Sequence, residues 1–94
     1  MSAIHTPGDW HVSELDATGE KSEYYIFIEP GVAVIERTAG GGQYDMADAH
    51  LLAASKLMLE ALELADAALS GANMNMAVVE KKVKAALSKA RGAS

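Results

Sequence analysis

Residues 45–69, DMADAHLLAASKLMLEALELADAAL, contain the longest run of helical periodicity in the chain. Large apolar residues recur every three or four positions without an interrupting proline or glycine, so we predict one unbroken helix. We expect Asp45 to be its N-cap, and Lys56 to pair with Glu60 one turn later. The apolar sector of this helix is wider than a thin sheet would cover. The sequence therefore predicts an oligomer interface formed by Leu51, Leu52, Met58, Leu59, Leu62 and Leu69.

A second helix is predicted over residues 76–91, after a break at Ser70-Gly71. Asn73 or Asn75 is the expected N-cap, and Gly92 suits the position that follows the C-terminus of the helix. Two helices joined by about five residues should lie antiparallel. The stripe expected to pack against a neighbour consists of Met76, Val79, Val83, Ala86, Leu87 and Ala90.

Residues 1–38 have the pattern of a β-meander. The segments YYIFIE (24–29) and VAVIERT (32–38) are rich in β-branched and aromatic residues and flank a Pro-Gly turn, which predicts a hairpin. Residues 10–15 are a more mixed first strand, after a TPGD turn at 6–9. Because both faces of residues 24–29 are apolar, we expect this strand to be central and covered on both sides.

Together these elements predict a single α+β domain over residues 1–94: a three-stranded antiparallel β-meander (1–38), a Gly-rich hinge (39–44) and a helical hairpin (45–92) whose helices cover the sheet. The chain has 94 residues, of which 18 are alanine and none is cysteine. Such a small core makes an isolated monomer marginal, and disulfides and cysteine-based zinc sites are excluded. We expect neither a membrane span nor a signal peptide.

The charge is distributed unevenly along the chain. Residues 1–70 carry 12 acidic and three basic side chains, whereas residues 71–94 carry one acidic and five basic side chains. The acidic part disfavours nucleic acid as a partner. Either these charges are solvated and complement each other within the molecule, or the sheet region faces a basic partner protein. The candidate partner-binding residues are Glu14, Glu20, Glu23, Glu29, Glu36, Trp10 and Tyr25.

Signatures of catalysis are weak in this sequence. GGG (40–42) precedes a helix, but no Gly-Lys-Ser/Thr follows, and Asp45 and Asp48 would repel a phosphate. His5, His11 and His50 do not have the spacing of a metal motif. No serine lies in a nucleophile-elbow context. We therefore expect no enzyme, no catalytic residues, no metal and no cofactor; a small hydrolase using His11 or His50 is the catalytic alternative.

HTPGDW (5–10) and ADAHLLAASKLMLEALE (47–63), with ALSKARG (86–92) closing the chain, resemble a family of short proteins of tailed phages and prophages. The resemblance covers most of the chain and implies a small accessory protein in the host bacterial cytoplasm. The family usually has proline where Asp9 stands and an Ala-Pro break where Ser55-Lys56 stands. Its members generally lack an assigned activity, so the resemblance carries over no site residues.

The function expected from residues and resemblance together is stoichiometric binding without catalysis, namely inhibition of a bacterial defence system in the manner of an anti-CRISPR protein. The expected partners are a host defence protein and further copies of this chain in a homodimer or higher oligomer, with no nucleic acid and no membrane. One alternative is an oligomeric sponge for a cyclic-nucleotide defence signal, stacked on Trp10 or a tyrosine. Another is a structural or assembly protein of the virion.

Overall fold

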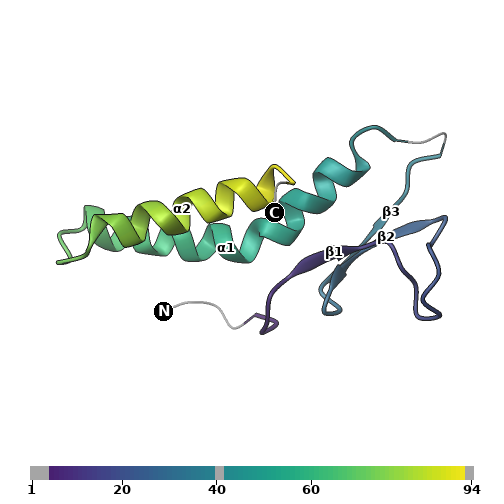
Figure 1. Cartoon of the computed structure of the whole chain (residues 1–94), viewed down its shortest axis with the longest axis horizontal. Coiled ribbons are helices and arrows are strands. Elements are labelled where there is room, and N and C mark those ends of the chain that lie inside the picture. Colours follow the sequence, from purple (N-terminus) through teal and green to yellow (C-terminus); the bar gives the residue numbers. More distant parts are fainter. Residues whose placement is uncertain (1–4, 40–41, 93–94) are drawn as a thin grey trace.

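The computed structural model describes residues 5–39 and 42–92. A three-stranded antiparallel sheet in the order β1-β2-β3 is followed by two antiparallel helices (Figure 1), as the sequence predicts. The elements are β1 (His11–Ser13), β2 (Tyr25–Glu29), β3 (Ala33–Glu36), α1 (Asp45–Leu69) and α2 (Met76–Ala90). The molecule is elongated, 49 × 26 × 17 Å, because the sheet packs under one end of α1 and the helical hairpin extends beyond it.

The sheet is built around β2. Ile26 lies opposite Ile35 of β3, and Ile28 lies opposite Val12 of β1. Both β2 isoleucines are essentially buried, and they form the core with Ala49 and Ala53 of α1. The alternation predicted for residues 24–29 therefore places one side of β2 against the helix.

The first strand is shorter than the predicted residues 10–15. The Asp16 carboxylate accepts hydrogen bonds from the backbone N–H groups of Thr18 and Glu20, at 2.9 and 3.2 Å. This side chain closes a tight turn directly after Leu15, which forms only an isolated bridge with Lys21. The competing local hydrogen bonds end the regular ladder at Ser13.

Coverage of the sheet differs from the prediction. Only α1 packs over it, through its first half, and the opposite face of β2 stays open: Tyr25 is 44% exposed and Val34 of β3 is 58% exposed. The expectations that β2 is covered on both sides and that both helices cover the sheet are wrong. The reason is geometric, since α2 packs along another side of α1 and follows it away from the sheet (Figure 1).

The start of α1 is held by Asp45, although not as the predicted N-cap. The N-cap is Tyr44, whose side chain makes no capping bond, and α1 begins at Asp45. The Asp45 carboxylate instead accepts hydrogen bonds from the Thr38 backbone N–H and hydroxyl, both at 2.9 Å. A Cβ at Gly42 would lie 2.6 Å from Thr38 Cβ, so this close approach requires glycine. Residues 40 and 41 of the predicted hinge lie outside the described residues.

The second helix agrees closely with its prediction. Of the two candidate caps, Asn75 accepts a hydrogen bond from the Ala77 backbone N–H at 2.9 Å. Gly92 adopts a φ of +81° just past the helix, the left-handed conformation that glycine tolerates best there.

Candidate interaction surfaces

The two helices meet along a seam of small side chains. Ala54 and Ala61 of α1 and Val79 and Ala86 of α2 are buried, and none of them belongs to the sheet-side core. In each helix the two residues lie seven positions apart, which places them on one side of the helix. Small residues let the two backbones approach closely, so the large side chains of the hairpin are directed elsewhere.

Most of the large side chains of α1 point to solvent. Leu51, Leu62 and Leu69 are 51%, 66% and 88% exposed, and Leu52 and Leu59 are exposed beside them. Met58 is half-buried. The six residues predicted as an oligomer interface are thus left largely uncovered by their own chain, as that prediction requires.

The second helix adds to the same surface. The Lys82 ammonium of α2 lies 2.6 Å from the Glu60 carboxylate of α1. These two residues therefore mark the same side of the seam on the two helices. Met76, Val83 and Leu87 lie on the other side of the α2 seam residues, as Leu51 and Leu62 do on α1. We call this shared surface the hairpin face; its members are Leu51, Met58, Leu62, Leu69, Met76, Val83 and Leu87.

The predicted α2 stripe is therefore only partly a packing stripe. Val79 and Ala86 are buried, but Met76 is 62% exposed and Leu87 is 45% exposed. Because the seam is centred on Val79 and Ala86, Met76 and Leu87 lie to one side of it and are displaced toward solvent.

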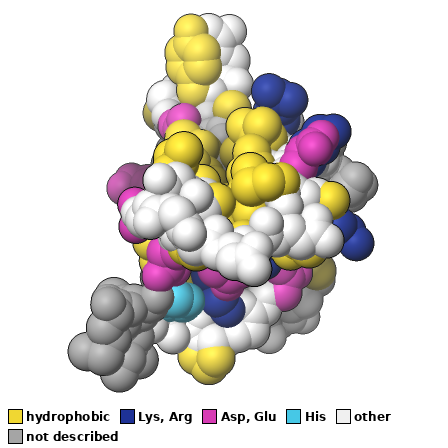
Figure 2. Space-filling view, turned by 90° about the vertical axis from the view of Figure 1, so that its left-hand side faces the viewer, with side chains coloured by type: hydrophobic (Ala, Val, Ile, Leu, Met, Phe, Trp, Pro, Cys, Tyr) yellow, Lys and Arg dark blue, Asp and Glu magenta, His cyan; other side chains and the backbone are white. Residues whose placement is uncertain are grey.

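Charges flank the hairpin face with opposite signs on the two helices. Figure 2 looks at the free end of the hairpin and shows hydrophobic side chains gathered over its upper part, mostly acidic side chains on one flank and mostly basic ones on the other. In sequence, α1 carries five acidic residues and one lysine, whereas α2 carries one glutamate and four lysines. Within the hairpin, the Lys82 ammonium donates to Glu60 and lowers the pKa of that carboxyl. Glu60 thus pairs with α2, and the expected partner Lys56 donates to the Gly8 carbonyl instead.

A second surface is the face of the sheet turned away from α1. Tyr25 lies opposite Glu36, and Phe27 lies opposite Val34, so the four side chains share this face. The rings of Tyr25 and Phe27 are 6.4 Å apart between centroids, and Tyr24 contacts Tyr25 at 6.5 Å. Tyr24 precedes β2 and alternates with Tyr25, so it adjoins this face only through its contact with the Tyr25 ring. We call Tyr25, Phe27, Val34, Glu29 and Glu36 the outer sheet face.

The predicted partner-binding residues divide into two groups. Tyr25, Glu29 and Glu36 lie on the outer sheet face, and Glu20 and Glu23 are exposed in the segment leading to β2. Glu14 instead bonds the Arg37 guanidinium at 2.8 Å, which lowers the pKa of the Glu14 carboxyl. Arg37 also donates to the Ser22 carbonyl, so this pair braces the ends of the sheet.

Trp10 also differs from the expectation that it joins the acidic surface. It packs against the buried core, and its indole N–H donates to the Thr6 carbonyl at 2.9 Å. The outer sheet face gains two residues that the sequence analysis did not single out, namely Phe27 and Val34. The signal was the apolar alternation on both sides of residues 24–29, which we had interpreted as coverage on both sides.

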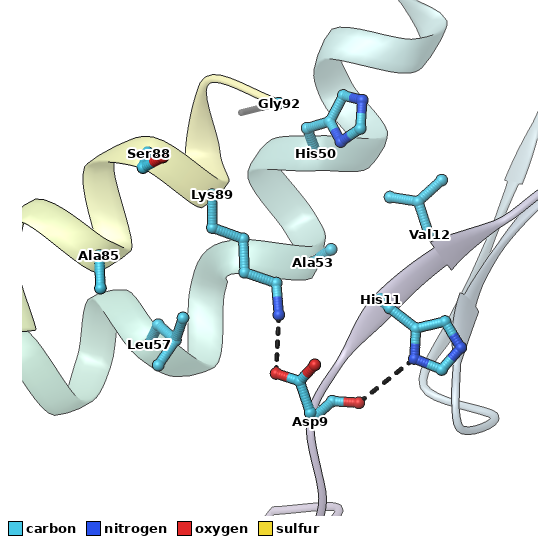
Figure 3. A pocket seen from close by; sticks show the side chains of 10 residues that line it. All are labelled: Asp9, His11, Val12, His50, Ala53, Leu57, Ala85, Ser88, Lys89 and Gly92. Atoms are coloured by element: carbon cyan, nitrogen blue, oxygen red, sulfur yellow. Dashed lines mark hydrogen bonds and ion pairs between the residues drawn. The ribbon is translucent and has the colours of Figure 1, made fainter. Parts of the chain in front are cut away.

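A shallow groove separates β1 from the helices (Figure 3). It is lined by Asp9, His11, Val12, His50, Ala53, Leu57, Ala85, Ser88, Lys89 and Gly92. The Lys89 ammonium lies 2.9 Å from the Asp9 carboxylate and, by its hydrogen bond, lowers the pKa of Asp9. Lys56 donates to the neighbouring Gly8 carbonyl. One lysine from each helix thus fastens the segment before β1 to the hairpin, a structural use of these polar groups.

The groove does not assemble its ionisable groups for catalysis. His11 contacts the Asp9 backbone carbonyl at 3.4 Å rather than its carboxylate, and Val12 lies between the two histidines (Figure 3). His50 lies beside Gly92, where an added Cβ would come within 2.9 Å of the ring. Among the residues that the structure describes, no group of three His, Cys, Asp or Glu is placed to hold a metal ion.

Comparison with known proteins gives one family. A family model described as Salmonella phage P22 protein Y8K6 matches residues 1–94, the whole chain. No curated protein and no solved structure matches it. In the part of the chain that the structure describes, no helix is both long and apolar enough to cross a membrane.

Proposed function

From the premise that this chain belongs to the Salmonella phage P22 protein Y8K6 family, we propose that it is a phage accessory protein that acts by stoichiometric binding in the host cytoplasm. The proposed target is a host protein with a basic surface, namely a component of a bacterial defence system, since small phage proteins recurrently inhibit such systems. In this proposal the protein has no catalytic role.

The observation that carries the proposal is the outer sheet face. Tyr25 and Val34 are 44% and 58% exposed there, beside the carboxylates of Glu36 and Glu29. Tyr24, which is 68% exposed, contacts the Tyr25 ring at the edge of this face. Exposed aromatic residues next to acidic ones suit an arginine-bearing surface, because the guanidinium stacks on a ring while it pairs with a carboxylate. Tyrosine is also enriched among the residues that contribute most to binding at interfaces.

The sheet is a suitable platform for such contacts. Tyr25 and Phe27 lie on the central strand, whose other side is fixed by the buried Ile26 and Ile28. Because this backbone is already fixed in the free protein, little backbone entropy is lost on binding.

The nucleotide-sponge alternative, with stacking on Trp10 or a tyrosine, is less well supported. The Trp10 ring packs against the core, and the exposed Tyr25 ring shares its face with Glu29 and Glu36, whose charges would repel a phosphate.

Affinity capture from the bacterial host tests this proposal with three matched baits: the natural chain, the double variant Tyr25→Ser/Glu36→Lys, and Glu80→Lys. The control makes the same charge change as Glu36→Lys, but on α2, at a side chain that is 64% exposed. We expect one host protein to be retained in equimolar amount by the natural chain and by Glu80→Lys, and lost with the double variant. The captured protein should also dissociate at high salt, because screening weakens contacts between charges.

Equal capture by all three baits would exclude the outer sheet face as the binding surface. Capture of nothing at any salt concentration, together with recovery of the chain in purified phage particles, would favour the virion alternative instead.

A further inference from the structure

We propose that the hairpin face is covered by the hairpin face of a second copy of this chain, with each α1 lying over the α2 of its partner. The result is a homodimer whose centre is a four-helix bundle. This contact is separate from the proposed host partner, which would bind the outer sheet face.

The first argument is the pattern of the face. On α1, Leu51, Met58, Leu62 and Leu69 are seven, four and seven positions apart, the spacing of the seam between packed helices. However, α1 packs against α2 of the same chain through Ala54 and Ala61 instead. The side chains that carry most of the apolar area of the hairpin thus form a second seam, which has no partner helix in the single chain. Such a continuous row of exposed apolar side chains differs from the scattered single ones that are normal on a protein surface.

The second argument is access. Ala49 and Ala53, which contact the sheet, lie on the side of α1 opposite to Leu51, because two residues along a helix correspond to a rotation of about 200°. The sheet therefore lies behind the hairpin face and does not obstruct a flat approach by a second hairpin. The same arrangement leaves the outer sheet face of each copy accessible.

The third argument is charge, which selects the arrangement and the occupant. On the side of the seam that carries the hairpin face, Asp48 and Asp66 lie one turn from the exposed leucines of α1. Lys84 and the C-cap residue Arg91 lie one turn from Leu87 of α2, with Glu80 beside Lys84. The remaining ion pairs of the hairpin, formed by Lys82 and Lys89, lie on the other side of the seam and are closed within the chain. Two identical faces can meet with α1 over α1, which brings like charges together, or with α1 over α2, which brings opposite charges together. Complementarity favours the second arrangement, and a second copy supplies both the apolar seam and the opposite flank.

This arrangement has a definite symmetry. A two-fold axis parallel to the helices, lying between the two hairpins, places each α1 beneath the partner's α2 and keeps both free ends together. An axis across the helices would place α1 beneath α1 and the free ends at opposite ends of the bundle. The positions of the free ends therefore distinguish the two dimers.

Sedimentation velocity on the full chain tests the contact. We expect the natural chain to sediment as a dimer at micromolar concentration and Leu62→Ser/Leu69→Ser to sediment as a monomer with an unchanged circular dichroism spectrum. The matched control Leu15→Ser removes a leucine of similar exposure, 53%, from the loop beside the sheet, and should remain dimeric. A monomeric natural chain at millimolar concentration would overturn the proposal, as would a dimer that survives both serine substitutions.

Spin labels test the arrangement, and the absence of cysteine from the chain permits a single labelled position. In Asn73→Cys the label sits in the connection between the helices. With α1 over α2 we expect the two labels within about 25 Å, since packed helices lie about 8–10 Å apart and the label linkers add to this. With α1 over α1 they would be separated by about 40 Å, from the 1.5 Å rise per residue, and that distance would contradict the proposed pairing.

Discussion

The sheet side and the hairpin side of α1 make their contacts in opposite ways. Near the sheet, α1 contributes the alanines Ala49 and Ala53 while the sheet contributes the large side chains, and the isoleucines of β2 are buried. Along the hairpin, both helices contribute small residues to the seam, and the leucines face outward. The sheet side forms a complete core on its own, whereas the hairpin side buries little apolar area until another surface covers it. This contrast explains why the exposed apolar residues gather on the hairpin.

The largest expected difference in stability is between two truncations, one in the sheet-side core and one on the hairpin face. Ile26→Ala removes a fully buried side chain and should lower the free energy of unfolding by about 2–5 kcal/mol. Leu62→Ala should change it by no more than about 0.5 kcal/mol in the monomer, because the side chain is already exposed. Urea denaturation at low protein concentration measures both. Equal losses of stability from the two substitutions would mean that the sheet side and the hairpin side do not differ.

Enlarging the seam should have the next largest effect. Ala61→Leu places a large side chain where the two helices are in contact and should destabilise the fold by about 1–3 kcal/mol. Ala77→Leu makes the same change at an exposed position of α2 and should cost no more than about 0.5 kcal/mol. Thermal denaturation compares them, and a seam that accepts leucine without loss would contradict close packing through alanine.

The α2 cap predicts a smaller effect within the hairpin. Asn75→Ala removes the hydrogen bond to the Ala77 N–H and should cost about 1 kcal/mol. Asn73→Ala, at the other candidate cap, should be nearly neutral. Chemical denaturation of the two variants checks the assignment, which would be reversed if Asn73→Ala were the costlier change.

The smallest effect concerns the ion pair between the sheet end and the hairpin. Because Lys89 lowers the pKa of Asp9 in the folded chain, the pair stabilises the fold above the unfolded pKa of about 3.9, and this contribution is lost as the pH falls through the folded pKa. Lys89→Met should therefore cost at most about 0.5 kcal/mol at pH 7, since Asp9 is exposed, and nothing once the pH is below the folded pKa of Asp9.

An NMR titration of the Asp9 carboxyl carbon should show its pKa rising in Lys89→Met. In Lys84→Met, which breaks a pair within α2 alone, the Asp9 titration should not change. An Asp9 pKa that is the same in all three proteins would remove Lys89 as the cause of the shift.

The same contrast separates what the sequence predicts from what it does not. Periodicity and termination signals are local, so residues 45–69 and 76–91 were predicted almost to the residue, and so was the capping role of Asn75. Which side of a helix meets which neighbour is set by packing between distant segments. The exposed position of the leucines was inferred from the width of the apolar sector, but the open face of β2 was missed, because an apolar outer side looks the same in sequence whether or not it is covered.

For the candidate surfaces, too, local features were predicted from the sequence and contacts between distant residues were not. The acidic character of the sheet region was evident in the sequence, and Tyr25 and Glu36 do share a face. The roles of Glu14 and Trp10 inside the fold depend on Arg37 and Thr6, and no local pattern identifies such partners.

The most direct test of the account is the solvent exposure of leucine methyl groups, measured by NMR with a soluble paramagnetic probe on the natural chain at millimolar concentration. In the single chain Leu62 is more exposed than Leu15, at 66% against 53%. If a second copy covers the hairpin face, the methyl signals of Leu62 should be attenuated less than those of Leu15. If the Leu62 methyl signals are attenuated more than those of Leu15, as their exposures in the single chain predict, the account is contradicted.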